Sequence, residues 1–269
     1  MKNKKAKENK KAKENKITEN HGITGLGTDY TVYILSAKEK LLAVLAGALV
    51  GFTASYIYFG NELLSILVAL VAGYKSISIF RNSKLKKRQK ELRLQFRDLL
   101  ESLSNSYTVG MTASRAFHAA YSDMAVEHGE NAYITQELKL ICASHDNQGI
   151  EIKDMVRDFA QRSGLDDAKS FAGVFEVSSD LGGDVAKVIR ETRDIISDKI
   201  EIELEIQTMV TGQRNQLNVL AIMPFVMAVA VRSFDTGSGG ALVVGVKILA
   251  MCLFVFAYWL GNKIVDIKV

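Results

Sequence analysis

The stretch LLAVLAGALVGFTASYIYF at residues 41–59 contains 19 residues and no charged side chain. An α-helix rises about 1.5 Å per residue, so this stretch can cross the roughly 30 Å hydrocarbon core of a bilayer. Residues 63–80, 215–231 and 241–261 have the same character, with at most one charge each. The sequence therefore predicts four transmembrane helices.

The connections between these stretches predict their pairing and orientation. Residues 60–62 join the first two stretches and residues 232–240 join the last two, so each pair is expected to form an antiparallel hairpin. Residues 81–97 carry eight Lys or Arg, whereas the two connections carry only Arg232. Because basic residues favour the inside, we expect a multi-pass membrane protein with both termini and residues 81–213 in the cytoplasm.

Composition supports a mosaic of soluble and membrane-embedded parts, since 24% of the 269 residues are charged while the mean hydropathy is +0.08. The tail repeats KKAKEN at residues 4–9 and 10–15. This tail either reinforces the inside orientation or attracts anionic lipid headgroups. The expected order is a Lys-rich disordered tail and linker (1–40), a hairpin (41–80), a cytoplasmic helical domain (81–213), a second hairpin (214–262) and a cytoplasmic tail (263–269).

The central block, residues 81–213, has apolar residues spaced mostly three and four apart. This spacing is typical of amphipathic helices that bury one stripe, and about six such helices fit the block. The stretch KIEIELEI at 199–206 alternates with a period of two, as a strand does. A seven-residue apolar repeat passes through it, so we predict helix there and an all-α fold throughout.

A weak internal repeat relates two parts of the block at a shift of 72 residues. Gly110 and Thr112 in the first copy align with Gly182 and Asp184 in the second, where Gly183 follows Gly182. Each glycine is expected to end a helix, and Thr112 and Asp184 to cap the next one. Two similar helical hairpins and a chance match are the alternatives. Gly149 is expected to end another helix.

Motifs that carry catalysis are not found in the sequence. There is no GxxxxGK[ST] phosphate loop, no GxSxG or HExxH motif, and the four histidines share no metal-ligand spacing with Cys or carboxylates. Residues 22–27 are glycine-rich but follow no predicted strand, so a flexible linker is favoured over a dinucleotide site. We expect no enzyme activity, no cofactor, no metal and no nucleic-acid partner.

Three residues inside the predicted spans have two interpretations each. Lys75 lies about one turn from the basic end of its span and Lys247 about two turns from the external end of its own, so each can extend its charge to the headgroups or serve a function. Pro224 is expected to kink its span, either as a tolerated bend or as a flexible point.

The order of these features resembles the type II secretion F family, and within it the TadB-like or TadC-like membrane proteins of Tad (Flp) pili. The resemblance is carried by QFRDLLESLSNSYTVGMTASRAF at 95–117, by Glu137 to Gly149, by MVRDFAQRSG at 155–164, by DLGGDVAKVIRE at 180–191, and by Gln213-Arg214 leading to Met223-Pro224.

The resemblance implies a non-enzymatic platform protein that couples a cytoplasmic secretion ATPase to pilin assembly. Its implied partners are that ATPase, a paralogous platform protein, prepilins and membrane lipid, in a homo- or hetero-oligomer. Charged helix faces are expected to dock the ATPase through Arg157, Arg162, Arg190 and Arg193. A permease subunit of an ATPase-driven transporter is the alternative, while the short connections disfavour a sensory receptor.

Overall fold

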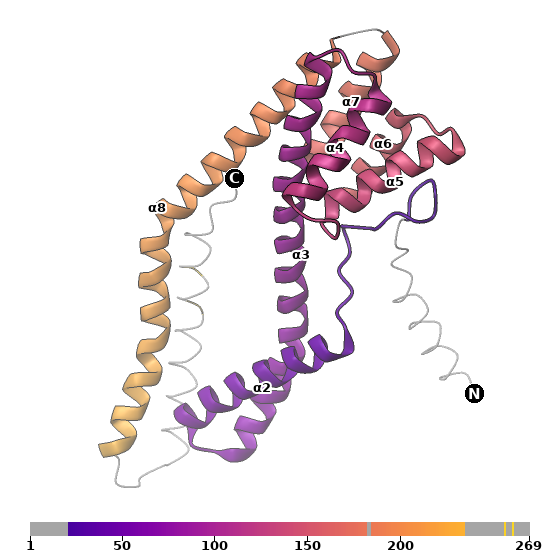
Figure 1. The fold of residues 1–269 in the computed structure, drawn as a ribbon. Coiled ribbons are helices and arrows are strands. Elements are labelled where there is room, and N and C mark those ends of the chain that lie inside the picture. The colour runs from indigo at the N-terminus through magenta and orange to yellow at the C-terminus, as the bar shows by residue number, and fades with distance from the viewer. Residues whose placement is uncertain (1–20, 182–183, 235–255, 257–259, 261–269) are drawn as a thin grey trace, which may run out of the picture. The chain divides into compact units, whose positions relative to one another are not determined.

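The computed structural model describes residues 21–181, 184–234, 256 and 260. Across these residues the chain forms seven α-helices and no β-strand, which confirms the all-α prediction (Figure 1). The helices are α2 (Ala37–Phe59), α3 (Glu62–Thr108), α4 (Ala113–Glu127), α5 (Tyr133–Gln148), α6 (Ile152–Ser163), α7 (Asp166–Leu181) and α8 (Val185–Phe234).

The chain divides into two compact units. One contains residues 1–34 and 82–199, and its described part is called the helical bundle here. The other contains residues 35–81 and 200–269 and is called the apolar unit. Helices α3 and α8 each contribute to both units, because the divisions fall within them after Arg81 and after Lys199.

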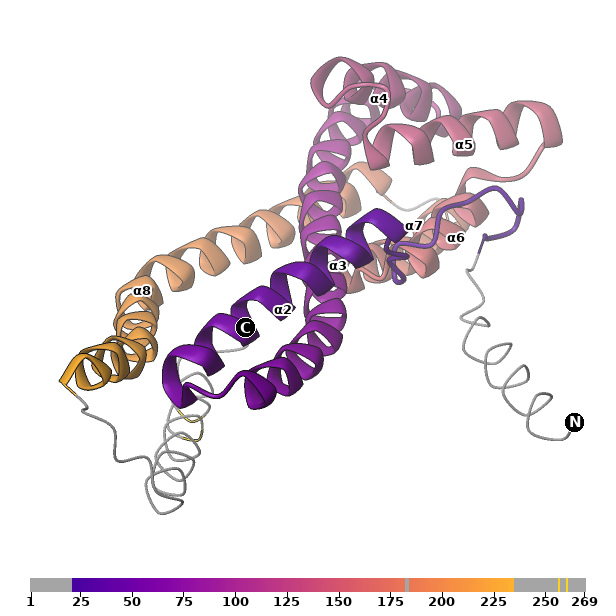
Figure 2. The same ribbon diagram turned by 90° about the horizontal axis from the view of Figure 1, so that it is seen from below.

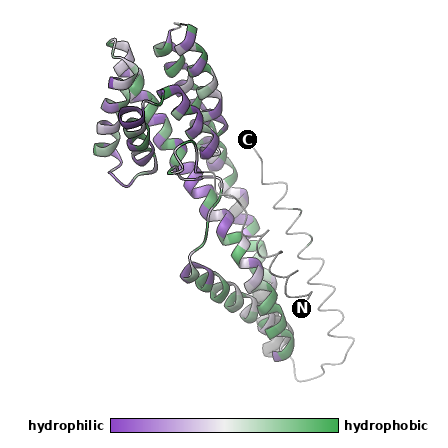
Figure 3. Cartoon of the chain, turned by 90° about the vertical axis from the view of Figure 1, so that its right-hand side faces the viewer, coloured by the Kyte–Doolittle hydropathy of each residue, from purple (hydrophilic) through white to green (hydrophobic). Residues whose placement is uncertain are grey.

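Two helices of the described residues are long and apolar enough to cross a membrane by length and composition. They are Ala37–Ile57 in α2 and Glu62–Thr108, which is α3. Four membrane-spanning helices were predicted, and the described residues contain two helices that satisfy these criteria. The third predicted span, residues 215–231, forms the end of α8, and the fourth, residues 241–261, falls almost entirely outside the described residues. Figure 3 shows the hydrophobic colouring concentrated in α2 and the first part of α3.

Small residues allow α2 and α3 to pack closely in the apolar unit. A Cβ atom on Gly47 would lie 2.5 Å from the Cβ of Ser76, and one on Gly51 would lie 2.6 Å from the Cβ of Ala72. Only glycine fits at these two positions, which are one helical turn apart, because backbones approach closely where side chains are small. Between the helices Gly60 takes the left-handed conformation, with φ of 65°, and ends α2.

The helical bundle contains the end of α3, helices α4 to α7 and the start of α8. Helix α4 packs on α5, α5 on α6 and α6 on α7, and both views show these helices gathered beside the later turns of α3 (Figures 1 and 2). Spacings of three and four place one stripe of each helix in the core. The largest buried apolar side chains include Leu92, Phe96, Leu100, Leu103, Phe117, Met124, Ile134, Leu138, Met155 and Phe175.

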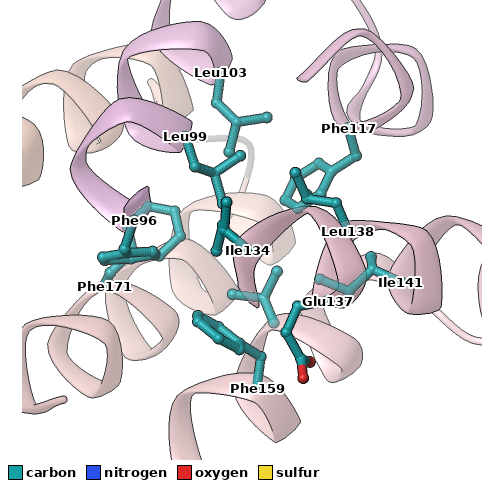
Figure 4. A pocket seen from close by; sticks show the side chains of 11 residues that line it. Phe96, Leu99, Leu103, Phe117, Ile134, Glu137, Leu138, Ile141, Phe159 and Phe171 are labelled. Carbon is teal, nitrogen blue, oxygen red and sulfur yellow. The ribbon is translucent and has the colours of Figure 1, made fainter. Parts of the chain in front are cut away.

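Aromatic rings join the bundle helices at their centre. The ring of Phe96 on α3 lies 5.9 Å from that of Phe159 on α6 and 5.7 Å from that of Phe171 on α7. These side chains, with Leu99, Ile134 and others, line the small space shown in Figure 4. Glu137 also borders this space, but its carboxylate points away from the apolar side chains (Figure 4). The carboxylate instead accepts hydrogen bonds from Arg162 on α6.

The helix ends test the predicted repeat. Gly110 has φ of 78°, its N–H donates to the carbonyl oxygen of Tyr107 at 3.0 Å, and the N–H of Met111 donates to that of Ser106 at 3.1 Å. These two bonds form a Schellman motif, so Gly110 ends α3 as predicted. Gly149 ends α5 in the left-handed conformation, with φ of 67°.

The capping residues behave differently in the two copies. The Asp184 carboxylate accepts the N–H of Lys187 at 2.9 Å and caps α8 as predicted. Thr112 occupies the N-cap position of α4, but its side chain makes no capping hydrogen bond, so that part of the prediction is wrong. Gly182 and Gly183 lie outside the described residues. The alternating stretch 199–206 lies within α8, as predicted, and α8 continues past Pro224.

Candidate functional site: a buried arginine cluster

A charged cluster lies at the junction of α5 and α6 in the helical bundle. Arg162, near the end of α6, has a side chain that is 0% exposed, and Glu137 on α5 and Asp158 on α6 are 3% and 5% exposed. Both guanidinium Nη atoms donate to Glu137, at 2.9 Å to Oε1 and 2.7 Å to Oε2. Nε donates to Oδ2 of Asp158 at 2.8 Å. The planar fork of Arg matches this arrangement, whereas Lys would not.

The charges of this cluster stabilise one another. Burial on its own lowers the pKa of Arg162, but the hydrogen bonds and negative charges of Glu137 and Asp158 outweigh burial and raise that pKa. The guanidinium therefore stays positively charged. Since a buried ion without partners is strongly unfavourable, each member of the cluster depends on the others.

Residues 21–33, called the strap here, cover this cluster. The Arg162 Nη1 atom donates to the carbonyl oxygen of Thr28 at 2.9 Å, and the Arg162 carbonyl accepts the N–H of Tyr30 at 2.9 Å. The N–H of Ile23 donates to Oδ1 of Asp158 at 2.8 Å, and the hydroxyl of Tyr30 donates to Oε1 of Glu137 at 3.0 Å. The strap thus provides further hydrogen-bond partners for all three charged side chains of the cluster.

Tyr30 is the anchor of the strap. Its side chain is 1% exposed, and its ring lies edge-on to that of Tyr133, with centroids 5.8 Å apart. Burial raises the pKa of Tyr30, and the nearby Glu137 charge raises it further, so the phenol stays protonated and keeps its donor. The guanidinium of Arg88 lies 4.9 Å from the centre of the Tyr30 ring, as in a cation–π contact.

Arg88 ties the strap to α3. It donates to the carbonyl oxygens of Asp29 and of Val32, the latter at 3.3 Å, and lies 5.9 Å from the ring centre of Tyr33. Arg88 belongs to the basic run at residues 81–97, which is expected to set the orientation in the membrane. The structure adds a specific structural role for this one member of the run.

Glycines let the strap approach the cluster. A side chain on Gly22 would collide with the Asp158 carboxylate, and one on Gly27 would collide with the Arg162 guanidinium. The stretch also folds on itself, since the N–H of Gly27 donates to the His21 carbonyl oxygen at 2.8 Å. The expectation of a flexible linker at residues 22–27 is therefore wrong. Glycine here serves close approach rather than flexibility.

The four arginines predicted to bind a partner do not form one site. Arg162 is fully buried, so the prediction that it lies on an exposed docking face is wrong. Arg157 is 47% exposed and pairs with Asp154 and Glu176. On α8, Arg190 reaches the Thr108 hydroxyl at 3.4 Å and Arg193 pairs with Asp194. Arg157 and Arg190 are exposed and Arg193 is partly exposed, so these three arginines remain as candidate contacts on α6 and α8.

One further group has the composition of a metal site. His128 Nε2 lies 3.0 Å from Oδ2 of Asp98 and 4.0 Å from Oε1 of Glu127. Arg97 already donates to Oδ1 of Asp98 at 2.6 and 2.9 Å. Because a guanidinium competes with a metal cation for the same carboxylate, we interpret the group as polar side chains that hold one another rather than as a metal site.

The buried cluster was not predicted from the sequence. Asp158 and Arg162 stand four residues apart, a spacing that also occurs on exposed helix faces, and Glu137 lies 25 residues earlier. The aromatic pair Tyr30 and Tyr33 beside the glycines was the available signal that the strap packs on something. No family model matches this chain, nor does any curated protein or solved structure.

Proposed function

We propose that this chain is an inner-membrane platform protein of a type IV-like (Tad/Flp) pilus or type II secretion system. In this role it couples a cytoplasmic secretion ATPase to pilin assembly and catalyses no reaction itself. The resemblance of residues 95–117, 155–164 and 180–191 to the type II secretion F family motivates the proposal.

The observation that carries the proposal is the continuity of α3. This helix runs for 47 residues, with an apolar first part and a second part whose side chains fill the bundle core. The basic residues of 81–97 begin where the apolar part ends and overlap the first core positions, the charge pattern expected where a helix leaves a membrane on the cytoplasmic side. An uninterrupted helix keeps its backbone hydrogen bonds throughout and so transmits displacement better than a loop would.

The exposed faces of α6 and α8 supply the ATPase contacts in this proposal. Arg157 on α6 and Arg190 and Arg193 on α8 alternate with acidic side chains. Complementary charge on a partner speeds association and sets its register more than it adds affinity. Exposed charges also make such an interaction sensitive to salt.

The test is capture of the secretion ATPase encoded beside this chain by the full-length protein in detergent. Wild-type protein should retain the ATPase, and reversal of Arg190 and Arg193 to Glu should reduce retention. Arg115→Glu is the matched control, because Arg115 is an exposed arginine on α4. Failure of the wild-type protein to retain any neighbouring ATPase would favour the permease alternative.

A further inference from the structure

We propose that the strap, residues 21–33, fastens the start of the first apolar hairpin to the helical bundle, with Arg162 as the positioning residue. The consequence for pilin assembly rests on the proposed function, whereas the fastening itself does not. Arg162 acts through the strap and needs no contact with a substrate.

Chain continuity gives the strap its place. The second helix of the hairpin, α3, continues directly into the bundle. The first helix, α2, starts at Ala37, and the last strap contacts are those of Arg88 with the Val32 carbonyl oxygen and the Tyr33 ring. Only residues 34–36 intervene, so Tyr33 and Ala37 are four Cα–Cα steps apart and separated by at most about 14 Å. A bound strap therefore restrains the hairpin at its beginning as well as at its end.

One side chain organises three of the strap contacts. Arg162 binds the Thr28 carbonyl oxygen directly, and it holds Glu137, whose Oε1 accepts the Tyr30 hydroxyl. It also holds Oδ2 of Asp158, while Oδ1 of the same carboxylate accepts the Ile23 N–H. Loss of the guanidinium would remove the hydrogen bond to the Thr28 carbonyl oxygen. It would also leave Glu137 and Asp158, which accept the other two strap hydrogen bonds, without the group that positions them.

The strap can open without unfolding the bundle. Its apolar side chains Ile23 and Leu26 are 56% and 75% exposed, and Tyr30 is the only large apolar side chain of residues 21–33 that is fully buried. Segments that bury little apolar surface and are held by polar contacts open locally at a low free-energy cost. The core residues of α5 to α7, in contrast, are held by apolar packing. The strap is therefore suited to release and rebinding.

The experiment measures hydrogen–deuterium exchange in the full-length protein, in detergent, for strap peptides and for α6 and α7 peptides. Gly27→Ala is the main variant, because its new methyl group would collide with the Arg162 guanidinium while every side chain of the bundle keeps its identity. Tyr30→Phe is the second variant, since it deletes the hydroxyl bond to Glu137 and keeps the ring. Leu26→Ala is the matched control within the strap, with an exposed side chain.

We expect Gly27→Ala to speed strap exchange by about tenfold or more, with α6 and α7 amides within about twofold of wild type. Unchanged strap exchange, or equal acceleration of strap and bundle, would overturn the proposal.

The consequence for function is tested in cells that lack the native gene. Gly27→Ala should reduce pilus assembly, with membrane levels and ATPase capture unchanged, while Leu26→Ala should assemble normally. Normal assembly by Gly27→Ala despite an open strap would show that fastening has no role in assembly. Cells that assemble pili without this protein would instead refute the proposed function, and the exchange measurement would still decide whether the strap is held by Arg162.

Discussion

Replacement of Arg162 by Met tests whether the guanidinium holds the cluster together. Met has a similar length but neither charge nor donors, so Glu137 and Asp158 would remain as buried carboxylates, 3% and 5% exposed, without their cation. Removal of one partner from a buried ion pair costs about 3–5 kcal/mol. This is a large fraction of the 5–15 kcal/mol that stabilises a typical domain.

The matched control is Arg157→Met on the same helix. Arg157 is 47% exposed, and its pairs with Asp154 and Glu176 are at the surface. Exposed ion pairs contribute about 1 kcal/mol or less. The two substitutions remove the same chemical group from one helix and differ mainly in burial.

Hydrogen–deuterium exchange of α5 and α6 peptides in the full-length protein measures both costs. Since each 1.36 kcal/mol corresponds to a factor of ten, Arg162→Met should speed exchange by at least about 100-fold. Arg157→Met should change it by about fivefold or less. Equal effects of the two substitutions, or less than about tenfold for Arg162→Met, would refute the assignment of the cluster as the support of α5 and α6.

Three further predictions concern single positions. Gly51→Leu should separate α2 from α3 and cost about 1–3 kcal/mol, measured by exchange in the hairpin. Gly110→Ala should lower the melting temperature because φ is +78°, whereas Gly173→Ala, inside α7 with open space around it, should raise it. The pKa of His118 should lie above its usual value, because the hydrogen bond to the Ser114 carbonyl oxygen and then the Asp146 carboxylate raise it. The contribution of His118 to folding stability is therefore full at low pH and is lost as the pH rises through the raised pKa. Asp146→Asn should lower the pKa of His118, measured by NMR.

The helical architecture was predictable because periodic apolar spacing is a local property. Phe96, Leu103 and Phe117 occupy core positions that their spacing indicated. The helix end at Gly110 was predictable for the same reason, since a glycine after an apolar run favours the left-handed conformation. Local patterns also identified the apolar stretches in α2 and α3.

The candidate site was not predictable, because its members meet only in the folded bundle. Arg162 and Asp158 have the spacing of an exposed ion pair, and their burial depends on Glu137 and on a strap more than 100 residues away in sequence. The glycines at 22 and 27 look the same in a flexible linker and in a close contact. Tertiary packing decided between the two interpretations.

Cysteine accessibility in intact cells tests whether the bundle is cytoplasmic and joined to a membrane hairpin, as we propose. Asn61→Cys and Glu130→Cys would be compared in a background in which Cys142 and Cys252 are replaced by Ser. A membrane-impermeant maleimide should label position 61 in intact cells and position 130 only after permeabilisation. Labelling of position 130 from outside, with position 61 protected, would contradict it.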